Sequence, residues 1–246
     1  HTLPWRKTKD PYRVLVSEMM LQQTQVSRVI PFYRAFLKKF PTPHALARAP
    51  LSDVLRAWSG LGYNRRARFL HEAAKAIGER HQGIVPCEYI ELRKLPGVGD
   101  YTAKAVRTFA FDEPEVMLET NIRAVVIHEC FPRGRSVRDE RMAPILAAAL
   151  ECVESPRVWY AALMDYGTHL KETHGNATRK SKTYTKQSKF EGSLRQVRGA
   201  ILRELLKAPQ TEHALRALVP SPMLPGALAG LKSDKMISER GGRYRL

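Results

Sequence analysis

The sequence has few cysteines and no long apolar run. Its three cysteines, Cys87, Cys130 and Cys152, are odd in number and far apart, which argues against a disulfide framework and against a metal site of closely spaced thiolates. No segment approaches the ~18 consecutive apolar residues of a membrane-spanning helix. No charged leader followed by an apolar stretch opens the chain. We therefore expect an intracellular protein without a membrane role, located in the cytoplasm or, in a prokaryote, with the nucleoid.

Acidic side chains are scarce relative to basic ones. The 246 residues include 41 Lys and Arg but only 24 Asp and Glu, so the formal net charge is +17. A charge of this size creates a positive field that attracts polyanions. Because 43% of the residues are hydrophobic, the chain can also bury a core. We therefore expect a globular protein whose partner is nucleic acid.

The alternating pattern of β-strands is absent up to about residue 170. Apolar residues recur there at helical spacing, and proline or glycine interrupts the pattern at Pro41, Gly60 and Gly83. This pattern predicts many short helices packed around a core. The expected fold class of this part is therefore all-α.

The C-terminal part has a different composition. Residues 178–189 (TRKSKTYTKQSK) are basic and lack acidic side chains, so we expect a linker over 176–192 whose Lys182 and Lys186 bind DNA phosphates. Beyond it, the sequence predicts a winged-helix-like module over 193–246 that binds DNA or protein. A docked helical cap with a solvated basic face is the alternative. The module would consist of helices over 194–206, 211–218 and 225–231 and a β-hairpin over 236–245.

A Gly-x-Gly turn separates two helical segments within LPGVGDYTA (95–103). Glycines at 97 and 99 would let the backbone approach an anion, and the N–H groups that begin the next helix would face that anion. An ordinary tight turn between helices is the alternative, but the flanking Leu-Pro and Thr-Ala match the helix-hairpin-helix motif more specifically. We expect four residues to hold a DNA phosphate here: Gly97, Val98, Gly99 and Thr102.

Three segments, in order along the chain, resemble one protein family. They are VSEMMLQQTQV (16–26), WSGLGY (58–63) and the turn at 95–103. Together they resemble the MutY-type adenine glycosylases of the helix-hairpin-helix superfamily, and the resemblance runs from about Leu3 to about Gly167.

The resemblance implies a two-lobed helix-hairpin-helix glycosylase fold. In this chain the glycosylase body would occupy residues 1–175, followed by the linker and the winged-helix-like module. Its six-helix lobe would span about 14–112, and its second lobe would combine 1–13 with 113–175.

The resemblance also implies that a nucleotide is flipped out of the duplex so that its glycosidic bond becomes accessible. In the family a Gln-Gln-Thr loop fills the resulting hole, and the tyrosine of Gly-Leu-Gly-Tyr acts as a wedge. In this chain these would be Gln22, Gln23, Thr24 and Tyr63. A solvated glutamine pair and a tyrosine packed in the core are the alternatives.

Glycosidic cleavage typically uses two carboxyl groups around an oxocarbenium-like transition state. Glu18 matches the general acid of the family. It lies in the apolar run VLVSEMML (14–21), where burial would raise its pKa and keep it protonated near neutrality. An exposed Glu on an amphipathic helix is the alternative.

The second carboxylate of the family is the aspartate of an Asp-x-Asn pattern, whereas this chain has Glu119-Thr120-Asn121. A displacement of about 1 Å in a positioned carboxylate can lower a rate about 100-fold. Either the site is built around the longer Glu119 side chain, or the chemistry differs. Asn121 would hold the sugar-phosphate or orient the carboxylate, with helix capping as the alternative.

Tyr101 stands where bifunctional relatives such as endonuclease III have the lysine that forms a Schiff base with the sugar. A phenol cannot form that bond. We therefore assign Tyr101 to the catalytic set with Glu18 and Glu119, and we expect hydrolysis without a strong β-lyase step. Lys104, one helical turn later, is expected to face a phosphate or solvent.

The chain departs from the family after the segment LMDYGTHLK (163–171), because no cysteine follows it. The family has four cysteines there, which hold an iron–sulfur cluster. We therefore expect no cluster, no other metal site and no cofactor, apart from a structural monovalent cation that could bind at the hairpin.

Residues expected at the base pocket include a further departure. Ala161 stands where adenine glycosylases have a Gln or Glu that reads the base, which weakens the case for adenine. Trp5 and Arg6 match the family and are expected to line the pocket. A buried Trp beside a surface Arg is the alternative.

The leading interpretation is a monomeric, monofunctional glycosylase that removes adenine from a mispair in double-stranded DNA. A glycosylase for a mismatched or damaged pyrimidine, such as thymine, uracil or an oxidised derivative, is the alternative. A non-catalytic DNA-binding protein is the second alternative.

Overall fold

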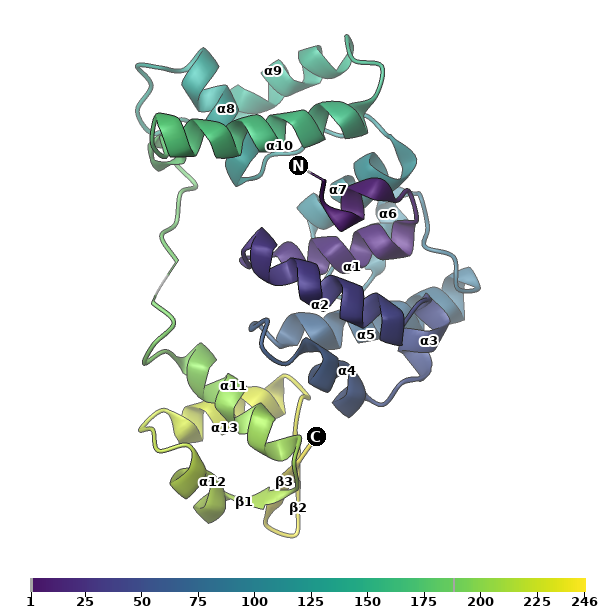
Figure 1. Ribbon diagram of the computed structural model, residues 1–246, viewed down its shortest axis with the longest axis vertical. Coiled ribbons are helices and arrows are strands. Elements are labelled where there is room, and N and C mark those ends of the chain that lie inside the picture. The colour runs from purple at the N-terminus through teal and green to yellow at the C-terminus, as the bar shows by residue number, and fades with distance from the viewer. Residues whose placement is uncertain (1, 188) are drawn as a thin grey trace. The chain divides into compact units, whose positions relative to one another are not determined.

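The computed structural model describes residues 2–187 and 189–246 (Figure 1). His1, at the start of the expected glycosylase body, and Ser188, inside the expected linker, lie outside the described residues. The structure is mainly helical, as the sequence predicts. Its contacts divide the chain into two units: His1–Glu18, Val85–Lys94 and Val98–Lys186 form the first, and Met19–Ile84, Leu95–Gly97 and Gln187–Leu246 form the second. The expected domain and lobe boundaries remain predictions.

The first unit is organised around helix α10, which lies against α8, while α9 also packs on α8 (Figure 1). Tyr160 of α10 is fully buried. Its hydroxyl accepts a hydrogen bond from the Met117 N–H (3.0 Å) and donates one to the Glu115 carbonyl (2.8 Å), which fixes the segment that leads into α8. The elements of this unit are η1 (Pro4–Lys7), most of α1 (Pro11–Leu21), α6 (Tyr89–Lys94), α7 (Asp100–Phe111), α8 (Thr120–Cys130), α9 (Asp139–Leu150), α10 (Pro156–Thr173) and η2 (Ala177–Lys180).

The second unit contains helix α5, which packs against α3 and α4. Trp58 of α4 and Phe36 of α2 are fully buried, with their ring centroids 5.9 Å apart in an edge-to-face arrangement. The Trp58 Nε1 donates to the Gly62 carbonyl (3.2 Å), so the core side chain also holds the loop before α5. The elements are α2 (Val26–Lys39), α3 (Pro43–Arg48), α4 (Leu51–Trp58), α5 (Arg65–His81), α11 (Leu194–Leu205), β1 (Gln210–Thr211), α12 (Glu212–Leu218), α13 (Leu224–Ser233), β2 (Ser238–Arg240) and β3 (Arg243–Arg245).

The C-terminal module has the predicted winged-helix order. Helices α11, α12 and α13 lie where the sequence predicts them, and β2 and β3 form the predicted hairpin. Gly241 and Gly242 have φ values of +58° and +67°, which suit the type I′ turn that two-residue hairpins favour. The short strand β1 pairs with β3, so the sheet order is β1-β3-β2. The predicted helices and hairpin are confirmed.

The predicted linker is structured where it begins. Residues Ala177–Lys180 form η2, and Thr178 is buried. The Val137 N–H donates to the Lys180 carbonyl (2.7 Å), and the Lys182 N–H donates to the Val137 carbonyl (2.8 Å). Ala177 packs against the core of the first unit, and these backbone hydrogen bonds add to that contact, so the basic composition of the segment did not reveal it. The Lys182 and Lys186 side chains are exposed, and their predicted contact with DNA remains a prediction.

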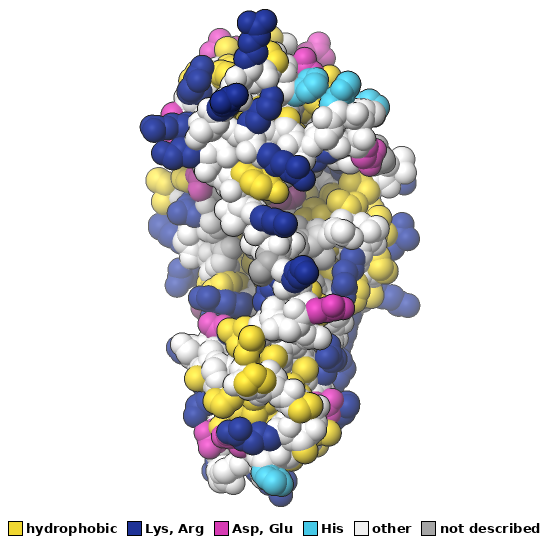
Figure 2. Space-filling view, turned by 90° about the vertical axis from the view of Figure 1, so that its left-hand side faces the viewer, with side chains coloured by type: hydrophobic (Ala, Val, Ile, Leu, Met, Phe, Trp, Pro, Cys, Tyr) yellow, Lys and Arg dark blue, Asp and Glu magenta, His cyan; other side chains and the backbone are white. Residues whose placement is uncertain are grey.

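One face of the protein carries many basic side chains. On the face drawn in Figure 2, Lys and Arg are widely spread and Asp and Glu are sparse, which agrees with the net charge of +17. Among the described residues, no helix combines the length and the apolar character needed to cross a membrane.

Candidate active site

Glu18 lies in α1 and is only 8% exposed, so the interpretation of an exposed Glu is wrong. Burial and, after it, the charge of Glu119 raise the pKa of Glu18 from 4.5 to about 7, while a hydrogen bond with Tyr101 opposes the shift. A pKa near the working pH is what a general acid requires. The structure therefore provides a carboxyl group that can donate a proton at neutral pH.

Tyr101 lies in the first turn of α7, and its hydroxyl is hydrogen-bonded to the Glu18 carboxyl group. Burial, followed by the charges of Glu18 and Glu119, raises the pKa of Tyr101 well above its ordinary value. The phenol thus stays neutral and acts as a hydrogen-bond donor. This contact orients the carboxyl group of Glu18.

Glu119 is the N-cap residue of α8. Its Oε1 accepts hydrogen bonds from the N–H groups of Asn121 (2.6 Å) and Ile122 (2.8 Å). Burial raises the pKa of Glu119, but these two N–H groups and the charges of Lys171 and Arg123 oppose the shift. Burial therefore raises the pKa of both carboxyl groups, but two N–H groups and two cations favour the ionised form of Glu119, whereas the Tyr101 hydrogen bond does so for Glu18.

Asn121 is not the cap of α8, so the capping alternative is wrong. Its Oδ1 accepts a hydrogen bond from the Lys171 Nζ (2.6 Å) of α10. Gly167, one turn earlier in α10, permits this arrangement, because a Cβ at that position would lie 2.3 Å from the Asn121 carbonyl oxygen. The sequence analysis did not identify Lys171.

Trp5, Arg6 and Ala161 also lie in the first unit. Trp5 is buried, and Arg6 is partly buried with its Nη1 2.7 Å from Asp165 Oδ2 of α10. Ala161 of α10 is partly buried. Arg6 is therefore a paired side chain rather than a solvated surface residue, and the role of all three in binding a base remains a prediction.

The Gly-x-Gly turn uses its two glycines differently. Gly97 has φ +76°, and a Cβ there would lie 2.5 Å from the Phe69 Cβ, so both conformation and space require glycine. Gly99 is the extended N-cap of α7, where a Cβ would meet only a side-chain atom of Arg93 at 3.9 Å. The missing side chain of Gly99 leaves open space in front of the N-terminus of α7, and an anion needs that space to reach the N–H groups of the helix. Val98 and Thr102 are buried, so only their backbone groups remain for the predicted phosphate contact.

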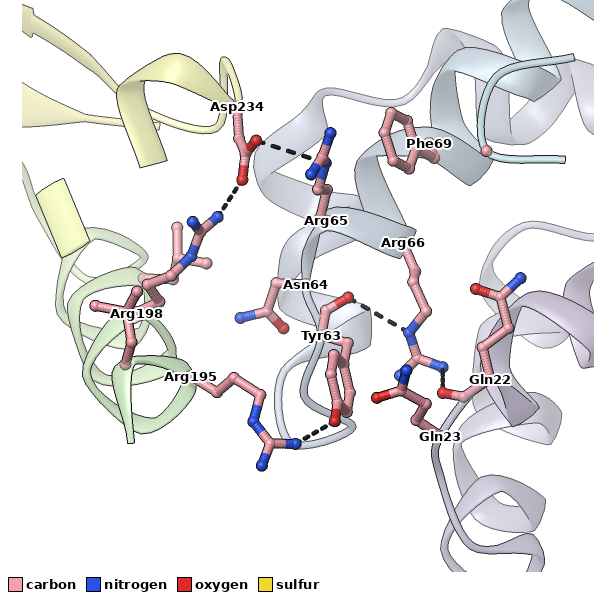
Figure 3. Close-up of a pocket in the computed structure, with 13 residues that line it drawn as sticks. Gln22, Gln23, Tyr63, Asn64, Arg65, Arg66, Phe69, Arg195, Arg198 and Asp234 are labelled. Atoms are coloured by element: carbon pink, nitrogen blue, oxygen red, sulfur yellow. Dashed lines mark hydrogen bonds and ion pairs between the residues drawn. The ribbon is translucent and has the colours of Figure 1, made fainter. Parts of the chain in front are cut away.

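Arg66 of α5 holds two loops of the second unit together, and sequence reasoning missed it (Figure 3). Its Nη1 donates to carbonyls near the end of α1, including those of Met19 (2.9 Å) and Gln22 (2.5 Å). Its Nη2 donates to Thr24 Oγ1 (2.9 Å) and to the Gly62 carbonyl (3.1 Å). Carbonyls at a helix end have no partner within the helix, so the guanidinium satisfies them. Burial lowers the pKa of Arg66 to about 10, and the group stays charged at neutral pH.

Tyr63 lies on the second of these loops and is not a core residue. It is partly exposed, and its ring lies between the guanidinium groups of Arg66 (5.3 Å) and Arg195 (4.9 Å). Gln23 is exposed on the first loop, with φ +55°. The interpretation of Tyr63 as a packed core side chain is therefore wrong.

The structure thus brings Glu18, Tyr101 and Glu119 together in the first unit. The loop after α1 and the loop with Tyr63 are joined in the second unit. Among the described residues, no group of three or more His, Cys, Asp and Glu side chains is placed to hold a metal ion.

Comparison with known proteins identifies the family. Residues 16–151 match the model of the HhH-GPD superfamily of base excision DNA repair proteins, and the chain belongs to this superfamily. The predicted family and the helix-hairpin-helix fold are confirmed.

The individual relatives carry a more specific name than the superfamily. Over 169 residues the chain is 43% identical to the adenine DNA glycosylase of Mycolicibacterium smegmatis. This alignment covers 67% of this chain and 57% of that protein. Over 126 residues it is 47% identical to the adenine DNA glycosylase of Buchnera aphidicola, covering 51% of this chain and 36% of that protein. The chain therefore spans 57% of the length of the first of these relatives and 36% of the length of the second.

A solved structure supports the same fold. The structure of a non-covalent endonuclease III–DNA complex superposes with a TM-score of 0.51 at 22% sequence identity, covering 66% of this chain and 73% of that chain.

Proposed function

We propose that this protein is a monofunctional DNA glycosylase that hydrolyses the N-glycosidic bond of a flipped-out adenine in a mispair. The observation that carries the proposal is the pair formed by Glu18 and Glu119: burial raises the pKa of both carboxyl groups, but Glu119 also accepts hydrogen bonds from two helix N–H groups and faces two cations, which oppose the shift. Two such carboxyl groups are what glycosidic hydrolysis needs. The adenine DNA glycosylases among the relatives support adenine as the base.

In this mechanism Glu18 donates its proton to the departing base. Tyr101 orients the Glu18 carboxyl group through their hydrogen bond. Glu119, ionised and held by the N–H groups of Asn121 and Ile122, stabilises the positive charge that develops on the sugar. Water then adds to the anomeric carbon of the sugar and passes its proton to the Glu18 carboxylate, which completes the hydrolysis. In this mechanism no side-chain amine attacks the sugar, because Tyr101 stands where bifunctional relatives have the lysine that does so.

Access to the glycosidic bond requires base flipping from double-stranded DNA. The loop of Gln22, Gln23 and Thr24 fills the space left by the base, and Tyr63 wedges the duplex open. Arg66 supports this assignment, because one buried guanidinium fixes both loops and so limits the freedom of the inserted groups.

The test is a panel of duplexes under single-turnover conditions, followed by alkali to cleave abasic sites. Adenine opposite 8-oxoguanine or guanine should yield strand scission, whereas an adenine–thymine pair should not. Product only from thymine or uracil opposite guanine would replace adenine by a pyrimidine. Binding without product on any duplex would favour the non-catalytic alternative. Strong borohydride trapping of the wild-type protein would contradict the monofunctional assignment.

A further inference from the structure

A cavity of about 460 Å³ lies in the second unit, where α11 faces α5 and the loop after α1. Figure 3 shows Arg195 and Arg198 on the α11 side and Tyr63, Arg65 and Phe69 on the side of α5. The volume falls in the range of ligand pockets, roughly 300–1,000 Å³. The C-terminal module therefore contributes side chains to a pocket that it shares with the candidate wedge.

The pocket is strongly basic. Four arginines line it, and Asp234 is the one carboxylate among its described lining residues. Asp234 pairs with Arg198, and its Oδ1 lies 3.5 Å from the Arg65 Nε. One carboxylate cannot neutralise four guanidinium groups, so the pocket attracts an anion.

The same pocket contains surfaces suited to a nucleobase. Tyr63 and Phe69 line it with aromatic rings, on which bases stack. Guanidinium groups now lie over both rings, so a base would stack on Tyr63 by displacing Arg195. Gln22 and Gln23 bring amide groups to its lining, and a glutamine amide can pair with the edge of a purine. A phosphate beside a flat aromatic base is the ligand that combines these features.

We propose that this pocket binds one nucleotide of duplex DNA, with its phosphate on Arg195 and Arg198 and its base against the Tyr63 and Phe69 rings. The C-terminal module thereby completes the DNA-binding site. The inference rests on the proposed function, because it takes DNA as the substrate. Guanidinium groups suit the phosphate, since they form charge-assisted and bidentate hydrogen bonds with it.

The linker and the module each contact the candidate wedge, Tyr63. Gln187 Nε2 donates a hydrogen bond to the Tyr63 hydroxyl (2.5 Å), and Arg195 donates to the same oxygen. Arg195 therefore joins the proposed phosphate site to the residue that enters the duplex. A nucleotide bound in the pocket would compete with or reorganise this contact, which couples DNA binding to the position of Tyr63.

The test compares Arg195→Met and Arg198→Met with the control Arg216→Met. Arg216 lies on α12 of the same module, pairs with Glu212 at 2.6 Å and does not line the pocket, so the control loses the same charge elsewhere. Binding to a duplex with one adenine–8-oxoguanine pair is measured by fluorescence anisotropy at several salt concentrations. Each pocket variant should bind about tenfold more weakly. The slope of log K against log salt should fall by about one for each, while the control should bind within about twofold of wild type.

The Asp234→Asn variant tests whether the pocket is a nucleotide site or only a space left where the module packs against α5. If the pocket binds a phosphate, removal of its carboxylate should tighten DNA binding. If Asp234 serves only to dock the module through Arg65 and Arg198, binding should weaken or stay unchanged, and either result overturns the proposal. Thermal melts of all variants show whether each is folded, and the sign of the Asp234→Asn effect provides a second test if an arginine variant unfolds.

The anisotropy titrations measure DNA binding and do not depend on base excision. A wild-type protein that binds the duplex but removes no base would refute the proposed function while leaving the pocket testable. Pocket variants that bind as tightly as Arg216→Met would refute the nucleotide site, whatever the excision assay gives.

Discussion

Replacing Glu18 by Gln should stabilise the fold while slowing base excision at least about 100-fold. The folded protein holds the pKa of Glu18 at about 7 against an ordinary value of 4.5, so folding favours the protonated form. Below pH 4.5 the group is protonated in both states, and its contribution to stability is fully present. As pH rises through 7 that contribution is lost, because a buried carboxylate must then be accommodated beside Glu119.

The magnitude follows from the size of this shift. A pKa displacement of one unit corresponds to about 1.4 kcal/mol, so the shift of Glu18 amounts to about 3 kcal/mol. Gln resembles the protonated acid and keeps an oxygen that can accept the Tyr101 hydrogen bond. The stability gained by Glu18→Gln should therefore be near zero at pH 4 and approach about 3 kcal/mol at pH 8.

Urea unfolding monitored by tryptophan fluorescence at a series of pH values measures this gain. Glu154→Gln is the matched control, since Glu154 is exposed and its substitution should leave stability unchanged at every pH. Equal pH dependence in Glu18→Gln and wild type, or a variant less stable than wild type at pH 8, would refute the reasoning. The same variant should excise the base at least about 100-fold more slowly, since it lacks the acid.

Lys171→Met removes a charge that lowers the pKa of Glu119, so the acid limb of the single-turnover pH–rate profile should move to higher pH, whereas Lys171→Arg should keep it near the wild-type position. Arg66→Met leaves several carbonyls at the end of α1 unsatisfied and should lower the free energy of unfolding by about 3 kcal/mol in urea titrations. Glu119→Asp should change that free energy by less than about 1 kcal/mol, because Asp is a good N-cap. The same change should slow excision about 100-fold, because the carboxylate is drawn back by one methylene group.

Each of these three predictions has a result that contradicts it. Lys104→Met, which removes a lysine paired with Asp100 at 3.2 Å, is the control for Lys171→Met. An acid limb that stays in place in Lys171→Met, or moves equally in the control, would remove Lys171 from the electrostatics of Glu119. Wild-type stability of Arg66→Met would show that water satisfies those carbonyls, and full activity of Glu119→Asp would show that the site is not built around the longer side chain.

The sequence predicted the parts of the structure that depend on neighbouring residues, such as the helices over 194–206 and 211–218. The structure explains why local sequence is enough there: Ser193 accepts a hydrogen bond from the Gln196 N–H at the start of α11, and Thr211 accepts one from the Ala214 N–H at the start of α12. Each cap lies three residues from its partner. The position of Glu18 within an apolar run likewise predicted its burial and its raised pKa.

Residues that act over long sequence separations escaped prediction. Arg66 reaches Gln22 across 44 positions, and Lys171 reaches Asn121 across 50. Arg66 lies in the basic run RRAR (65–68), which on sequence grounds resembles a solvated helix face. Only the packing of α5 beside the end of α1, and of α10 beside α8, gives these cations their partners.

In the proposed mechanism, helix α1 links the chemical step to base flipping. Glu18 lies one turn before the helix ends at Leu21, and Gln22 follows directly. Arg66 binds carbonyls in that last turn, so it holds the residues between the acid and the flipping loop as well as the loop itself. Loss of Arg66 should therefore disturb both steps, whereas loss of the Tyr63 ring should affect insertion alone. The two defects differ on a substrate whose base is already unpaired, because there an intact acid can act without a wedge.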